Sequence, residues 1–141
     1  MEIVIHHNPA CGTSRNVLQI IRDAGYDPVV VEYLDIGWTR SQLQALFAAA
    51  GITPRQALRT SKSPAEELGL LDPSVSDAAL LDAMLAHPVL VNRPIVACAN
   101  GVKLCRPSGV VLDLLDRRPP APWAKEDGAV LIDEHGNRLP E

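Results

Sequence analysis

The 141-residue chain is long enough for one domain that buries roughly two-thirds of its unfolded surface. Hydrophobic residues make up 47% of it and charged residues 21%, as in ordinary globular proteins, but only 4% is aromatic, so the core must be mainly aliphatic. The formal net charge of −4 argues against binding to nucleic acid or to an anionic membrane, because both partners require a basic surface.

The chain shows no signal for export or membrane insertion. Residues 1–6 lack the basic stretch and long apolar run of a signal peptide, and no apolar run approaches the roughly 20 residues that span a bilayer. The three cysteines are an odd number and lie too far apart for a zinc knuckle or a disulfide scaffold. We therefore expect a cytoplasmic protein with reduced thiols.

The N-terminal quarter of the chain predicts a parallel strand–helix–strand unit. A strand over residues 2–6 ends at the turn-forming Asn8-Pro9, and the helix that follows carries apolar side chains at helical spacing until Gly25 closes it. Residues 29–33 then form a continuous β-branched run, which predicts a strand buried on both faces.

A helical insertion is expected next. Four helix-start signals predict its helices, and they are Thr39 with Gln42, Thr53-Pro54, Ser63-Pro64 with Glu66, and Ser76. The first of these helices should end at Gly51, and the last at His87-Pro88.

Two strands and a last helix complete the predicted elements. Residues 94–97 and 102–105 flank Asn100-Gly101, a strong signal for a two-residue hairpin turn. Residues 108–116 predict an amphipathic helix that a Pro-rich stretch ends. The tail beyond that stretch carries no readable pattern.

The order of elements is strand–helix–strand, a helical insertion, then strand–strand–helix. This order predicts an α/β protein with a thioredoxin-like fold (βαβ…ββα), to which the insertion at about residues 39–88 is an addition. No internal repeat or linker interrupts the chain, so we expect a single domain over residues 1–141.

The position of Cys11 predicts a reactive thiol. Cys11 lies where a parallel strand passes into a helix, the place where α/β sheets commonly bind ligands. The first-turn N–H groups of Gly12, Thr13 and Ser14 present partial positive charge there, which stabilises a thiolate and can bind an anionic substrate. A buried, inert cysteine is the alternative, but a Cys between Ala and Gly in a Pro-initiated loop is a poor core residue.

Side chains of the same loop can strengthen this effect. The Ser14 hydroxyl and Arg15 can add hydrogen-bond donors, and His7, if protonated and near the sulfur, would also lower the pKa of the thiol. Because position 14 is Ser, the chain has no Cys-x-x-Cys dithiol, and an internal disulfide of that kind is not expected.

The remaining cysteines and histidines predict no cofactor chemistry. No cysteine has an arginine six positions later, so a phosphatase-type cysteine loop is absent, and no His/Cys/Asp set has the spacing of metal ligands. We expect no metal and no bound cofactor. Cys98 is interpreted as a core residue, and Cys105 as packing at a strand end, with a role in the pocket as its alternative.

Three arginines are candidates for binding an anion beside Cys11. Arg59 ends a predicted short helix, whereas Arg93 and Arg106 each precede a proline, which holds their backbone extended. In thioredoxin-like folds the loop before the third strand packs beside the first helix's N-terminus and its X-Pro bond is typically cis, which would bring Arg93 to Cys11. Three guanidinium groups around one thiolate would suit a small tetrahedral oxyanion.

With these motifs in place, the sequence resembles the glutaredoxin-coupled arsenate reductase family. The resemblance rests on residues 7–16, Leu58-Arg59, 92–96 and 104–107, and runs from residue 3 into the tail. It implies that Cys11 attacks arsenate and that His7 lowers the pKa of that thiol. It also implies that Arg59, Arg93 and Arg106 bind the oxyanion and stabilise the transition state.

The resemblance further implies the electron route. Cys11 would form an adduct with arsenic as water leaves, and glutathione, the co-substrate, would attack that adduct. Glutaredoxin, the protein partner, would then reduce the resulting mixed species with release of arsenite.

Two other functions stay open. One is a thiol-redox regulator that acts through partner binding on the same fold. Such regulators typically carry Cys-x-x-Cys and lack the three arginines, so Ser14 and Arg59 count against it. The other is a glutathione-linked reductase of another substrate, because a pocket with three arginines also suits phosphate-like groups or the carboxylates of glutathione.

Overall fold

The computed structural model describes residues 1–141, which form two compact units. One unit contains Met1–Glu32 and Arg93–Glu141 and holds every strand, whereas the other, Tyr33–Asn92, holds only helices and turns. The helical unit contains the predicted insertion; that the whole chain is a single domain stays a prediction. No helix has both the length and the apolar character that a membrane span requires.

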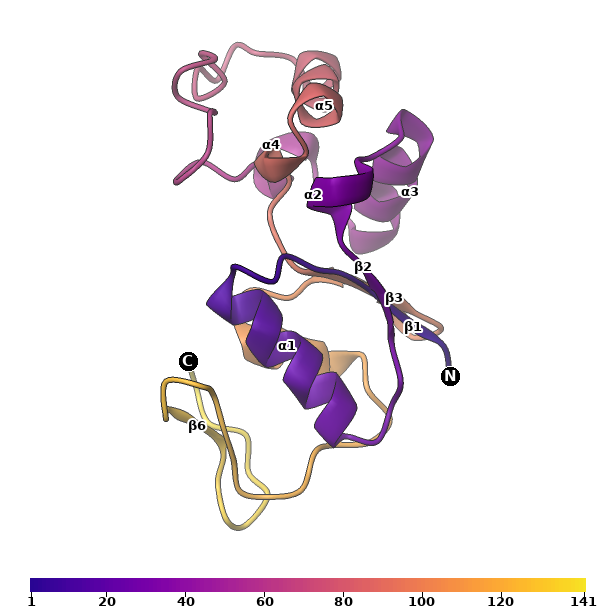
Figure 1. The fold of residues 1–141 in the computed structure, drawn as a ribbon, viewed down its shortest axis with the longest axis vertical. Helices are drawn as coiled ribbons and strands as arrows, with labels where there is room; N and C mark the ends of the chain where they lie inside the picture. The colour runs from indigo at the N-terminus through magenta and orange to yellow at the C-terminus, as the bar shows by residue number, and fades with distance from the viewer. The chain divides into compact units, whose positions relative to one another are not determined.

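A four-stranded mixed sheet organises the first unit (Figure 1). Its strands are β1 (Ile3–His6), β2 (Val29–Val31), β3 (Ile95–Cys98) and β4 (Gly101–Leu104), in the order β2-β1-β3-β4. β1 pairs in parallel with β2 and antiparallel with β3, which pairs antiparallel with β4. Helix α1 (Gly12–Asp23) connects β1 to β2, so the predicted thioredoxin-like α/β fold is confirmed.

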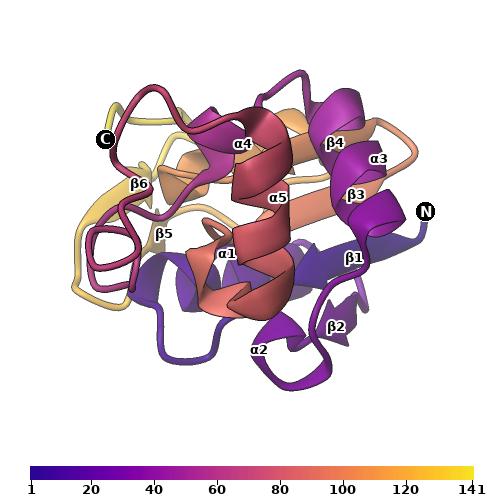
Figure 2. The same ribbon diagram turned by 90° about the horizontal axis from the view of Figure 1, so that it is seen from above.

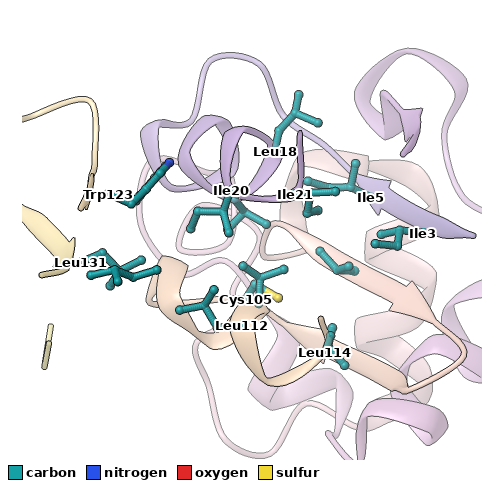
Figure 3. Packing of buried hydrophobic residues seen from close by; sticks show 14 residues of the cluster. Ile3, Ile5, Leu18, Ile20, Ile21, Cys105, Leu112, Leu114, Trp123 and Leu131 are labelled. Atoms are coloured by element: carbon teal, nitrogen blue, oxygen red, sulfur yellow. The ribbon is translucent and has the colours of Figure 1, made fainter. Parts of the chain in front are cut away.

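The core of this unit lies between the sheet, α1 and the 3-10 helix η2 (Ser108–Asp113) (Figure 3). Ile20 and Ile21 of α1 are fully buried against Ile3 and Ile5 of the sheet and Leu112 of η2. Aliphatic side chains therefore dominate, as the composition predicted. They fix α1, and with it the loop that precedes α1, against the sheet.

The second unit consists of short helices, and three of them, α3, α4 and α5, begin where the sequence predicted. They are α2 (Tyr33–Ile36), α3 (Arg40–Ala50), α4 (Pro54–Ala57), α5 (Asp77–Ala86) and the 3-10 helix η1 (Pro88–Leu90). The capping box of Thr39 with Gln42 is present, Gly51 ends α3 with a left-handed φ of 68°, and the Ser76 side chain caps α5. Helices α3 and α5 lie side by side (Figure 2).

The prediction of a helix that starts at Ser63-Pro64 is wrong. Leu68 N–H donates to the Pro64 carbonyl, but the turn ends at Gly69, whose φ is 72°. Leu70 N–H then donates to the Ala65 carbonyl. A residue in this left-handed region cannot continue a right-handed helix, so the segment remains a single turn.

Three predicted elements of the first unit differ in detail. The strand at 29–33 is not buried on both faces, because β2 is an edge strand and Val29 is 49% exposed. The hairpin turn falls on Ala99 and Asn100, one position early, since Cys98 pairs with Gly101. The helix predicted at 108–116 is the 3-10 helix η2 and is shorter.

The tail, which the sequence left unread, forms a two-stranded hairpin of β5 (Trp123–Ala124) and β6 (Val130–Ile132). Hydrogen bonds attach it to the last residue of α1 and to the second turn of that helix. The Trp123 indole Nε1–H donates to Asp23 Oδ2 at 2.9 Å, and the Glu126 N–H donates to Asn16 Oδ1 at 3.0 Å.

Candidate active site

The loop from β1 to α1 places Cys11 at the start of the helix. The Asn8 side chain accepts a hydrogen bond from Ala10 N–H at 2.9 Å, and Asn8 O accepts from Cys11 N–H at 3.0 Å. Cys11 has extended backbone angles and is the N-cap of α1, and its carbonyl accepts from Arg15 N–H. The sulfur thus lies beside the first-turn amides, and Cys11 is only 8% exposed.

The surroundings of Cys11 favour its thiolate. Burial raises the pKa of the thiol, but the Ser14 backbone N–H, the Arg93 charge, and the hydrogen bond and charge of Arg106 outweigh burial and hold the pKa below its usual value. Of the three first-turn amides predicted to act, the one from Ser14 donates to the sulfur. The thiol is therefore more acidic than an ordinary cysteine.

Arg93 and Arg106 converge on this sulfur. Arg106 Nη1 donates to Cys11 Sγ at 3.7 Å and to the Arg93 carbonyl at 3.2 Å, and the Arg93 charge acts on the thiolate. The Arg93–Pro94 peptide bond is cis, as predicted, and so is Arg106–Pro107. One guanidinium thus connects the Cys11 sulfur to the loop that precedes β3.

Arg59 belongs to the helical unit, where it follows α4. Its N–H donates to the Leu90 carbonyl at 2.8 Å, and its Nε donates to the Ser61 carbonyl at 3.1 Å. The preceding Leu58 pairs with Val91 in an isolated β-bridge. These contacts fix the backbone of Arg59, and its role in binding an oxyanion stays a prediction.

His7 does not meet the condition under which its charge would act on the sulfur. Burial lowers the pKa of His7, against a smaller opposing effect of Glu32, so the imidazole is largely neutral at pH 7, whereas a charge effect on the thiol requires its protonation. Its Nδ1 lies 2.6 Å from Ser14 Oγ, which also accepts from Asn8 N–H at 3.1 Å. This geometry favours a Ser14 O–H donated to Nδ1, with the ring proton on Nε2.

This contact gives His7 an indirect role at the thiol. Ser14 is fully buried, and its hydroxyl is held by His7 on one side and by the Asn8 amide on the other. The same residue donates its backbone N–H to Cys11. His7 therefore reaches the thiol only through Ser14, and its effect on the pKa of that thiol stays a prediction.

The other two cysteines, Cys98 and Cys105, pack in or against the hydrophobic core. Cys105 is fully buried, and burial raises the pKa of its thiol to about 12, which agrees with the predicted packing role. Cys98 is partly buried against the core, and its sulfur lies 3.6 Å from the Leu114 carbonyl. All three cysteines are free thiols.

Arg15, expected to add a donor for an anion, is already engaged. Its Nη2 and Nε donate to the two carboxylate oxygens of Glu126 at 2.6 and 3.1 Å, and its Nη1 donates to the Pro9 carbonyl at 2.8 Å. A Cβ at Gly12 would lie 3.2 Å from the same carboxylate, so Glu126 reaches the first turn of α1. Glu126 was not among the predicted site residues, because it comes from the tail, which carries no readable sequence pattern.

No group of three or more His, Cys, Asp or Glu side chains is clustered as metal ligands would be. The chemistry that this arrangement can supply is that of a thiolate with cationic hydrogen-bond donors around it. Such a site attacks an electrophilic centre that carries negatively charged oxygens.

Known proteins are similar to this chain in both sequence and fold. The model of the ArsC family matches residues 6–114. Arsenate reductase ArsI2 of Synechocystis sp. is 66% identical to this chain, over 97% of this chain and 98% of the relative. The arsenate reductase of Escherichia coli K12 is 49% identical over 97% of both chains.

The solved structure of arsenate reductase from Vibrio cholerae superimposes with a TM-score of 0.77 at 37% identity. The match covers 82% of this chain and 98% of that one. The family model includes the Cys11 loop and both arginines that converge on the sulfur. The chain belongs to the ArsC family.

Proposed function

We propose that this protein reduces arsenate to arsenite, with Cys11 as the nucleophile. The observation that carries the proposal is the contact of Arg106 with Cys11 Sγ, together with the Arg93 charge at the same sulfur. It provides an activated thiolate and a place for an oxyanion within one group of residues. The names of the relatives, all arsenate reductases at 49–66% identity, support arsenate as the oxyanion.

In the first step the Cys11 thiolate attacks arsenic, and one arsenate oxygen leaves as water after protonation. Arg93 and Arg106 bind the remaining oxygens and offset the charge that shifts onto them, which is electrostatic stabilisation by groups already in place. Gly12, Thr13 and Ser14 contribute first-turn amides to the same anion.

The electrons come from external thiols, with glutathione as co-substrate and glutaredoxin as partner. Glutathione attacks the Cys11–arsenic adduct, and glutaredoxin reduces the mixed species with release of arsenite. In sum, two thiols lose two electrons and two protons and become a disulfide. Arsenic gains the electrons, and one oxygen leaves as water. Cys11 returns as a thiolate.

The cysteines of the chain itself support this external route. Cys105, with a pKa of about 12, supplies almost no thiolate at neutral pH, and Ser14 occupies the position of a resolving cysteine one turn along the helix. We place the protein in the cytoplasm, where the glutathione pool is reduced.

The test is arsenite release by the purified protein with arsenate, glutathione and glutaredoxin, beside the same assay with thioredoxin alone. We expect turnover in the first assay and none in the second. Activity under thioredoxin alone, with a Cys11–Cys105 disulfide trapped during turnover, would contradict the proposed electron route. Absence of arsenite under every reductant would contradict the function itself.

A further inference from the structure

A cavity of about 430 Å³ lies along α1, next to the thiolate site, and His7 is among its lining residues. Its lining begins at Pro9 and Arg15, beside the Cys11 loop, and reaches Arg22 in the last turn of α1. The tail hairpin supplies another part of the wall through Trp123 and Glu126. In Figure 3, Trp123 lies beside α1. Cys11 is not among the lining residues.

The cavity suits an organic anion larger than arsenate. Its volume is typical of pockets that hold small organic ligands and far exceeds that of a single tetrahedral oxyanion. Arg15 and Arg22 supply two cations, Glu126 is the only acidic residue of the lining, and Leu18 and Trp123 supply apolar surface. Arg22 is exposed and takes part in none of the ion pairs.

The charge of Arg15, at one end of the cavity, interacts with the charge of Cys11. The pKa of Arg15 is raised chiefly by its hydrogen bond to Glu126, and the Cys11 charge adds to that effect. Both members of the Arg15–Glu126 pair are nearly half exposed, at 44% and 46% of their side-chain surface. Exposed ion pairs contribute little stability, so another carboxylate can take the place of Glu126 on Arg15 at small cost.

The proposed chemistry needs a ligand of this kind, because its second thiol comes from outside the chain. We infer that Arg22 and Arg15 of the cavity bind the reducing thiol. This ligand would be a small thiol-containing peptide with two carboxylates, the class to which glutathione belongs. The carboxylates would bind to the two guanidinium groups, the peptide would pack on Trp123, and its sulfur would face the Pro9 end. This inference rests on the proposed function.

Binding can be tested without turnover by using S-methylglutathione, which has no free thiol. In a Trp38→Phe variant, Trp123 is the only tryptophan, and Trp38 lies in the helical unit, stacked on Tyr33. We expect a saturable change in Trp123 fluorescence on titration. The indole N–H resonance of Trp123 in the wild-type protein gives the same readout if that variant folds poorly.

The matched variants are Arg22→Gln in the cavity and Arg40→Gln on α3. Loss of one charged contact should weaken S-methylglutathione binding at least about tenfold in Arg22→Gln and leave Arg40→Gln unchanged. Equal affinity in both variants, or no saturable signal at Trp123, would overturn the inference.

Kinetics separate this inference from the proposed function. At saturating arsenate, Arg22→Gln should raise the KM for glutathione about tenfold without changing the KM for arsenate, and Glu126→Gln should lower the KM for glutathione. With 2-mercaptoethanol, which has no carboxylate, Arg22→Gln should behave as wild type. If Arg22→Gln releases arsenite with an unchanged KM for glutathione, the cavity assignment is wrong and the proposed function stands. If no thiol supports arsenite release, the proposed function is wrong. In that case the S-methylglutathione titration still decides whether the cavity binds this ligand.

Discussion

Replacing Arg106 by lysine tests the thiolate site most directly. One terminal nitrogen of Arg106 donates both to Cys11 Sγ and to the Arg93 carbonyl, while the rest of the guanidinium is left to bind an oxyanion. A lysine keeps the charge but has no planar fork, so it cannot make both contacts and still bind the anion in a bidentate manner. Removing one preorganised donor costs about 2–4 kcal/mol of transition-state stabilisation. This corresponds to a loss of about 30- to 1,000-fold in kcat/KM for arsenate.

Two measurements follow the effect, namely kcat/KM for arsenate and the pH dependence of alkylation by iodoacetamide. The hydrogen bond and charge of Arg106 lower the pKa of Cys11, so the alkylation midpoint should rise in Arg106→Lys and rise further in Arg106→Gln, which also loses the charge. Arg40→Lys is the control, because Arg40 forms a surface ion pair with Asp82. If Arg106→Lys matched that control in both measurements, the inferred role of Arg106 would be wrong.

Three other outcomes follow from the structure. Cys11→Ser should abolish arsenite release and keep the melting temperature, since a hydroxyl forms almost no nucleophilic oxyanion at neutral pH. Cys98→Ser, the control, should keep most activity. Substantial turnover by Cys11→Ser would contradict the assigned nucleophile. Mass spectrometry of protein quenched during turnover should find no Cys11–Cys105 disulfide, because Cys105 is fully buried. His6 has its pKa lowered by burial to about 4, so the unfolded chain binds more protons between pH 6.5 and 4. The free energy of unfolding should then fall by on the order of 3 kcal/mol across that range, and less in His6→Gln when both are followed by urea titration.

Local signals in the sequence predicted most elements of the fold. These elements each depend on a few neighbouring residues. They are the apolar face of α1, the capping box at Thr39, the left-handed backbone conformation of Gly51 and the β3–β4 hairpin. The wrong prediction for residues 29–33, a strand buried on both faces, depends on distant partners. The exposure of Val29 follows from the position of β2 at the sheet edge, which no pattern within the strand encodes.

The candidate site shows the same division. The position of Cys11 at the start of a helix could be read from the strand-to-helix junction, and the proline after Arg93 and Arg106 marked both arginines. The protonation state of His7 could not be read, because it is set by burial against chain segments remote in sequence. Glu126 lies 111 positions from Arg15 in a tail without periodicity, so no local signal could pair them.

The origin of the cavity wall in the tail hairpin has a consequence for protein synthesis. A ribosome that has made the chain as far as Leu114 has already supplied Cys11 and both arginines that converge on its sulfur, together with β1 to β4 and η2. Trp123 and Glu126, which wall the cavity, emerge later. A nascent or truncated chain of that length would lack the wall of the inferred cavity and also Leu131 and Ile132 of the hydrophobic core, so it would lose core packing together with the place for its reductant.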